Sequence, residues 1–278
     1  MALFRALESS RPDRLFDDPF APLFLRAPLR LVLWSSRIPG LGSLVTWLVD
    51  RRGHGARSSG VARTRFIDDA LRAALDDGVA QVVILGAGFD CRAYRLPALA
   101  RSRVFEVDHP DTLAEKRRRL EAILPAAPGH VRFVGTDFNQ QALAPAIARS
   151  GYDAGARTCF LWEGVTNYLT DAAIDSTFRW FGTARSGSVV IFTYVHRQVL
   201  SAPETFAGAP QLLRRLERLG EPWTFGFDPA ELASYLAARR LRLVEDLGAA
   251  EYRARYWGAR TDGLRGYEFY RVAVAAVT

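Results

Sequence analysis

This chain of 278 residues has only two cysteines, Cys91 and Cys159, and a single lysine, Lys116. Two cysteines cannot build a disulfide framework, and their separation is unlike that of zinc ligands. We therefore expect no structural metal. We also expect a protein of the reducing cytoplasm.

Long hydrophobic runs are absent as well. The most apolar early segment, residues 27–49, is interrupted by Arg30, Arg37 and the pair Pro39-Gly40. It falls short of the roughly 18 uninterrupted apolar residues that a membrane span requires. The N-terminus has acids and prolines where a secretory leader needs an apolar core. We expect two short amphipathic helices in this region, no leader and no membrane partner.

Positive charge is in modest excess. The chain has 37 basic and 30 acidic residues, a formal net charge of +7. The arginines are distributed along the chain and interleaved with acids, and even the densest cluster, EKRRRLEAIL, has acids at helical spacing. This pattern is typical of solvated helix faces. We expect no nucleic-acid partner, and a monomer or homodimer.

The chain divides into two regions by pattern. Residues 1–60 appear helical and irregular and end in RRGHGARSSG, which is typical of a flexible connection, so we interpret them as an N-terminal extension or lid. In residues 61–278, short apolar β-rich runs alternate with helical segments. This alternation predicts an α/β fold with a parallel or mixed sheet covered by helices on both faces.

The stretch QVVILGAGFDCRAYRL, residues 81–96, predicts a buried strand followed by a ligand-binding turn. Gly86 and Gly88 permit a sharp bend and a close approach of a ligand to the backbone. Glu106 follows Gly86 by 20 residues, which suits a carboxylate that binds ribose hydroxyls.

Two cofactor classes use such a turn. The dinucleotide pattern needs a third glycine, where this chain has Cys91, and Asp90 would place a negative charge beside the pyrophosphate. Both departures favour a cofactor that contains adenosine without phosphate, and S-adenosylmethionine is such a molecule. An NAD(P)-dependent oxidoreductase is the alternative.

Further candidates follow the other predicted strands, because ligands bind at the carboxyl ends of parallel strands. Asp137 and Phe138 suit the amino group and the ring of an adenine. Tyr194 and His196 follow the fifth strand and are our catalytic candidates. His196 is the preferred general base, because histidine titrates near neutrality. An acceptor that arrives as a carboxylate needs no base.

Several motifs in order resemble the leucine carboxyl methyltransferase family of S-adenosylmethionine-dependent enzymes, particularly its bacterial members. The motifs are ARTRFIDDAL, QVVILGAGFDCRAYRL, VFEVDHP, TDF and FLWEGVTNYLT, and the resemblance covers roughly residues 10–275. It implies a Rossmann-like class I methyltransferase fold, with a seven-stranded, mostly parallel sheet and an antiparallel last hairpin. It also implies methyl transfer to an oxygen, with S-adenosyl-L-homocysteine as product.

The resemblance also implies residue roles. Arg63 matches the arginine that pairs with the methionine carboxylate, and Glu163 matches the glutamate near the ammonium and sulfonium end. Gly86 and Gly88 match the glycine turn, Glu106 and Asp108 the acids near the ribose, and Asp137 with Phe138 the adenine pair. This chain has Thr166-Asn167 where the family commonly has a bulky apolar pair, so the family's substrate does not transfer directly.

We expect the acceptor to be a small molecule of secondary metabolism with a carboxyl or hydroxyl group. We expect it to bind against an apolar wall of Trp223, Phe225 and Phe227. The resemblance also permits the C-terminal carboxylate of a protein or peptide.

Overall fold

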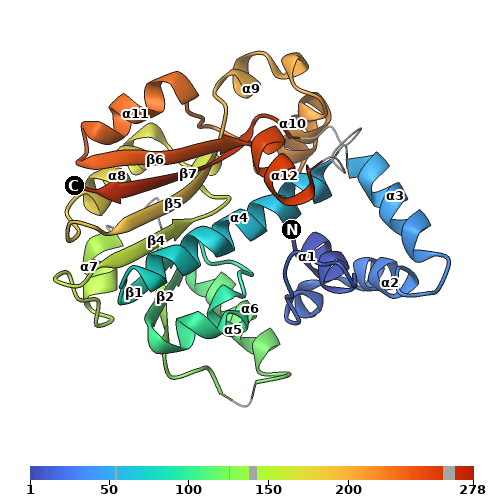
Figure 1. Cartoon of the computed structure of the whole chain (residues 1–278), viewed down its shortest axis with the longest axis horizontal. Coiled ribbons are helices and arrows are strands. Elements are labelled where there is room, and N and C mark those ends of the chain that lie inside the picture. Colours follow the sequence, from blue (N-terminus) through green and yellow to red (C-terminus); the bar gives the residue numbers. More distant parts are fainter. Residues whose placement is uncertain (54, 125, 138–142, 259–266) are drawn as a thin grey trace.

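The computed structural model describes residues 1–53, 55–124, 126–137, 143–258 and 267–278. Seven strands form one sheet in the order β3-β2-β1-β4-β5-β7-β6 (Figure 1). They are β1 Gln81–Leu85, β2 Arg103–Asp108, β3 Val131–Gly135, β4 Thr158–Trp162, β5 Val189–Val195, β6 Leu241–Gly248 and β7 Tyr270–Val277. Strand β7 runs antiparallel to both β5 and β6, and the other neighbours are parallel. The predicted fold class is confirmed.

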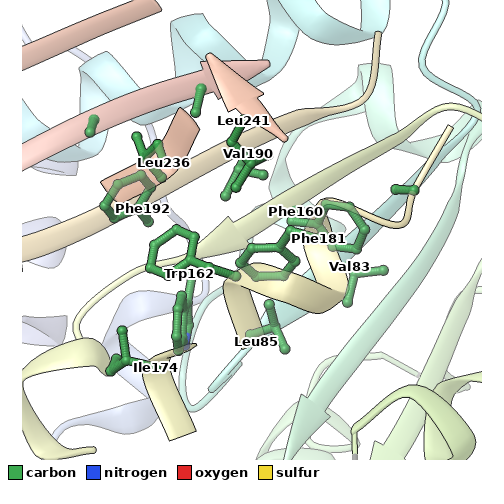
Figure 2. Packing of buried hydrophobic residues seen from close by; sticks show 14 of the residues in the cluster. Val83, Leu85, Phe160, Trp162, Ile174, Phe181, Val190, Phe192, Leu236 and Leu241 are labelled. Carbon is green, nitrogen blue, oxygen red and sulfur yellow. The ribbon is translucent and has the colours of Figure 1, made fainter. Parts of the chain in front are cut away.

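Helices cover both faces of this sheet because its central strands are apolar on both sides. Val83 and Leu85 of β1 pack on one face beneath α7 Leu143–Ala148, α8 Asp171–Phe181 and α11 Pro229–Ala237. Figure 2 shows side chains of β1, β4 and β5 on this face, against Ile174 and Phe181 of α8 and Leu236 of α11. Val82 and Ile84 pack on the other face beneath α4 Ala56–Asp76 and α12 Ala249–Trp257.

The remaining helices form an N-terminal group and the segments that connect the strands. They are α1 Ala2–Ser9, η1 Ala21–Phe24, α2 Ala27–Ser35, α3 Gly42–Gly53, α5 Arg92–Arg95, η2 Pro97–Arg101, α6 Pro110–Leu120, η3 Thr166–Tyr168, α9 Gln198–Ser201, η4 Pro203–Thr205 and α10 Ala209–Arg218. Within the described ranges, no helix combines the length and the apolar character that a bilayer span needs.

The connection predicted at residues 51–60 is instead divided between the end of α3 and the first part of α4. Helix α4 begins at Ala56, so the expected boundary between residues 60 and 61 falls inside it. Ser58 and Ser59 are buried, and the Ser59 hydroxyl lies 2.7 Å from that of Tyr252 in α12. Small residues here allow α4 to approach α12 closely, which is why a linker-like composition forms a packed helix.

Candidate functional site

A glycine turn follows β1 where the neighbouring strands also end. Gly86 and Gly88 have φ of +63° and +39°, in the left-handed region. A Cβ on Gly86 would lie 2.3 Å from Cγ2 of Val165, so this position requires glycine. The backbone N–H of Gly88 donates to Oδ2 of Asp108 at 2.6 Å. The acid at the end of β2 thus holds the turn.

A cavity of about 500 Å³ opens above this turn. It is lined by the ends of β1 and β4 and by residues of α1, α4 and α10. Five of the predicted cofactor residues meet in its wall, and they are Arg63, Gly86, Gly88, Asp90 and Glu163. Three segments far apart in the sequence therefore bring together a glycine turn, a guanidinium and two carboxylates.

Arg63 and Glu163 form an ion pair in the cavity wall. The Nε and Nη2 atoms of Arg63 lie 3.2 Å from Oε1 of Glu163, and the guanidinium also stacks over the Tyr270 ring, 4.2 Å from its centre. The other carboxylate oxygen, Oε2, accepts from Nη1 of Arg92 at 2.8 Å. Burial disfavours ionisation of Glu163, but Arg92 and Arg63 together lower its pKa. Glu163 therefore stays charged at neutral pH.

Arg92 is the centre of this charged cluster and is only 1% exposed. Its Nε donates to Oδ1 of buried Asp68 at 2.7 Å, and its Nη1 also contacts Oδ2 of Asp90. Burial opposes the charge on Asp90, yet the guanidinium of Arg92 holds the pKa of this carboxyl far below its usual range. Asp90 reaches the cavity as predicted, but with its carboxylate bound by Arg92.

The cluster continues into the N-terminal extension. Arg95 contacts Asp68 at 2.6 Å, and Arg5 of α1 contacts Asp18 at 2.9 Å. Arg5 also donates to the backbone oxygen of Phe89 in the glycine turn, at 2.5 Å. Helix α1 is therefore fastened directly to the loop that shapes the cavity.

The structure separates the two acids predicted near the ribose. Glu106 is fully buried, 2.8 Å from Nζ of Lys116 and 3.1 Å from the hydroxyl of Tyr94, and it does not line the cavity. This burial disfavours contact between Glu106 and a ribose, and its role stays a prediction. Asp108 lies at the end of β2, next to Gly88, and lines a second hollow of about 700 Å³. Tyr168 lines both spaces, so Asp108 is the better placed of the two acids.

The predicted adenine pair is described only in part. Asp137 follows β3 and is half-buried, outside the residues that line the cavity. Phe138 lies outside the described residues. The roles of both stay predictions.

Neither catalytic candidate lines the cavity. Tyr194 is fully buried on the face of the sheet that also holds Val83 and Leu85. Its hydroxyl donates to Oδ2 of Asp246 at 2.7 Å and contacts Arg271 at 2.9 Å. His196 follows β5, and its Nδ1 accepts from the backbone of Gln198 at 3.2 Å. Burial lowers the pKa of His196, which keeps the imidazole neutral. The positions of both residues favour structural roles.

We expect Tyr194→Phe and His196→Ala to bind S-adenosyl-L-homocysteine as the wild type does. Removing the Tyr194 hydroxyl leaves a charged Asp246–Arg271 pair short of one hydrogen bond, which costs about 1–3 kcal/mol of unfolding free energy. Calorimetric titration and urea unfolding measure the two effects separately. A tenfold loss of affinity for the ligand without a loss of stability would show that the substituted residue takes part in the binding site.

Other cavity residues were only partly foreseen. Trp223 lines the cavity as predicted, whereas Phe225 and Phe227 are buried in the core beside Phe178. The sequence reasoning missed Leu212 and Leu216 of α10, which also line the cavity. Their spacing of four in an arginine-rich helix was the available signal.

Comparison with known proteins agrees with this geometry. Residues 1–182 match the family described as leucine carboxyl methyltransferase. Two relatives from Streptomyces coelicolor carry the name "Putative S-adenosyl-L-methionine-dependent methyltransferase". One is 40% identical over 62% of this chain and 56% of its own length. The other is 36% identical over 72% of this chain and 69% of its own length. A Parafrankia relative with the same name is 39% identical over 61% of this chain and 52% of its own length, so the chain spans about half the length of several curated relatives.

Two solved structures share the fold along nearly the whole chain. A DUF574 family protein from Streptomyces avermitilis has a TM-score of 0.55 at 17% identity, with 99% of this chain and 97% of that one covered. A putative methyltransferase from Thermobifida fusca has a TM-score of 0.54 at 18% identity, with 98% and 97% covered. At these identities the likeness supports the fold alone.

Proposed function

Because this chain belongs to the leucine carboxyl methyltransferase family, we propose that it is an S-adenosylmethionine-dependent O-methyltransferase that acts on a small molecule. The observation that carries the proposal is the meeting of the glycine turn, Arg63 and Glu163 in one cavity at the ends of β1 and β4. A methionine tail is a zwitterion, with a carboxylate and an ammonium group a few bonds apart. Arg63 and Glu163 offer the opposite charges side by side.

The residues fit this cofactor better than a dinucleotide. The carboxylates of Asp90 and Glu163 line the cavity at the turn, where a dinucleotide would place its pyrophosphate. Asp108 at the end of β2 would accept hydrogen bonds from ribose hydroxyls. The bound cofactor supplies an electrophilic methyl group on its sulfonium. The protein's own part is alignment of the acceptor and exclusion of water.

The acceptor oxygen favoured by the cavity is that of a carboxylate. Among the described lining residues, the carboxylates are Asp90 and Glu163, and arginines lower the pKa of both. An ion-paired carboxylate with a lowered pKa is a poor proton acceptor at neutral pH. An alcohol would need a better base, whereas a carboxylate arrives ionised. Tyr168, Trp223 and Tyr267 also line the cavity and would present a phenol or indole donor to such an oxygen.

Gly88→Arg is expected to abolish measurable binding of S-adenosyl-L-homocysteine, because the new side chain would project into the cavity from a left-handed position. Isothermal titration calorimetry measures this. Gly151→Arg is the matched control, since Gly151 also has a left-handed φ, +86°, and has open space where its Cβ would lie. Equal binding by both variants would place the cofactor elsewhere.

The acceptor class can be tested without knowing the acceptor. The protein is incubated with methyl-labelled cofactor and a small-molecule extract, and the labelled product is treated with mild alkali. A methyl ester releases its label as volatile methanol, as we expect, whereas a methyl ether keeps it. An alkali-stable product would point to a hydroxyl acceptor.

A further inference from the structure

The most conspicuous surface outside the site is an arm formed by α2 and α3. We define the arm as residues 26–52, which Figure 1 shows at one edge of the molecule, away from the sheet. Within the described residues, seven of the twelve strongly exposed large apolar side chains belong to it. They are Leu29, Leu31, Trp34, Leu41, Leu44, Trp47 and Leu48. Trp34 is 62% exposed and Trp47 is 52% exposed.

The exposed leucines of α3 share one face of the helix, which Leu41, directly before its first residue, continues, whereas Val49 packs inward against the buried cluster around Leu33. Leu41, Leu44 and Leu48 recur at spacings of three and four, which places them on one side of a helix, with Trp47 beside them. Helix α3 has no buried residue, and Leu33 is the one buried residue of α2. Soluble monomers rarely expose so many large apolar side chains in one short segment, and larger exposed apolar patches mark interaction sites.

The charge of the arm selects among possible partners. The arm has five arginines, at positions 26, 30, 37, 51 and 52, and a single acid, Asp50. Both carboxylate oxygens of Asp50 are taken by Arg57, at 2.8 Å each. Arg51 lies 5.3 Å from the centre of the Trp47 ring, so positive charge borders the apolar face itself. Two such arms would repel each other, which disfavours a second copy of the chain.

We propose that the arm binds the surface of an anionic lipid membrane, with its leucines and tryptophans at the headgroup boundary and its arginines against the phosphates. Short basic helices with Leu and Trp on one face adopt this interfacial position without spanning the bilayer. Each basic residue near an anionic surface strengthens binding roughly fivefold. This proposal departs from our expectation, drawn from the sequence, that the protein has no membrane partner. The proposal is independent of the proposed function.

The test uses the full chain and two kinds of vesicle, one of phosphatidylcholine alone and one with about a third phosphatidylglycerol. Co-sedimentation should show at least roughly tenfold stronger binding to the anionic vesicles, weakening as salt is raised. Tryptophan emission should shift to shorter wavelength at the same time. Equal binding to both vesicles, or none to the anionic ones, would overturn the proposal.

Two variants keep the result specific. Trp34→Ser combined with Trp47→Ser should reduce vesicle binding at least roughly tenfold, and both side chains are exposed, so the fold is preserved. Leu219→Ser is the matched control, because Leu219 is 63% exposed outside the arm, and it should bind as the wild type does. Light scattering measures the mass of the protein in solution and so tests whether the arm binds a second copy of the chain. Self-association that the double tryptophan variant abolishes would assign the arm to a second copy and refute the lipid proposal.

Discussion

Glu163→Gln is expected to weaken binding of S-adenosyl-L-homocysteine by about 30- to 1,000-fold. The substitution replaces a carboxylate whose side chain is only 15% exposed by a neutral amide of the same shape, so the ligand's ammonium group loses its charged partner. Losing one member of a buried, hydrogen-bonded charge pair costs about 2–4 kcal/mol. Isothermal titration calorimetry at neutral pH, where Glu163 is ionised, measures the change.

Glu115→Gln is the control for this variant. Glu115 also bonds two arginines, Arg118 and Arg119, but lies on α6, outside the cavity lining. It should bind the ligand with wild-type affinity. An unchanged affinity in Glu163→Gln, with the thermal midpoint intact, would mean that the ammonium group lies away from Glu163.

Arg92→Met should lower the free energy of unfolding by about 3–5 kcal/mol, the usual cost of removing one partner from a buried ion pair. Methionine fills much of the same volume, so the loss reports charge more than packing. It leaves Asp68, Asp90 and Glu163 without their shared guanidinium. Urea unfolding followed by circular dichroism measures the difference.

The pH dependence of this loss has a defined sign. Arg92 lowers the folded-state pKa of Glu163 and of Asp90, so its stabilisation is fully present above their unfolded values near pH 4. It is lost as the pH falls through the lower folded values. The difference in the free energy of unfolding between the wild type and Arg92→Met should therefore become smaller on acidification. Arg179→Met, which removes an exposed ion pair with Asp175, should show no measurable loss. Equal stability of wild type and Arg92→Met at neutral pH would contradict this account of the cluster.

The sequence was a good guide to the sheet because the strands that build it are short apolar runs with polar residues directly after them. The short apolar runs within residues 61–278 lie in β1 to β7. The start of α4 was missed because Ser58, Ser59 and Gly60 look like a linker, and only their packing against α12 and α1 makes them helical. Such packing is a tertiary effect that no local pattern carries.

The site was predictable where chain position fixes it. Gly86, Gly88 and Glu163 directly follow β1 and β4, and the ends of parallel strands meet at one edge. The choice between Glu106 and Asp108 was not predictable, because both lie on the same side of β2, and Lys116 from α6 takes the first. The role of Tyr194 was not predictable either. It lies near the end of the apolar run of β5, but alternate residues face opposite sides of a strand, and the hydroxyl of Tyr194 is bound by Asp246 and Arg271.

The arm shows a further limit of sequence reasoning. Its two amphipathic helices were expected from the pattern of residues 27–49, and α2 and α3 are both present. An apolar face predicts that something covers it, and within one chain the usual cover is the core. Here the helix face that carries Leu44 and Trp47 is exposed to solvent. The direction of a helix face depends on its neighbours, which a local pattern does not contain.

A crystal structure of the complex with S-adenosyl-L-homocysteine tests the central claim most directly. We predict the amino-acid tail of the ligand between Arg63 and Glu163, the turn at Gly86 and Gly88 beneath it, and the ribose hydroxyls against Asp108. Ligand density in another cavity, or a tail directed away from Arg63 and Glu163, would contradict the account.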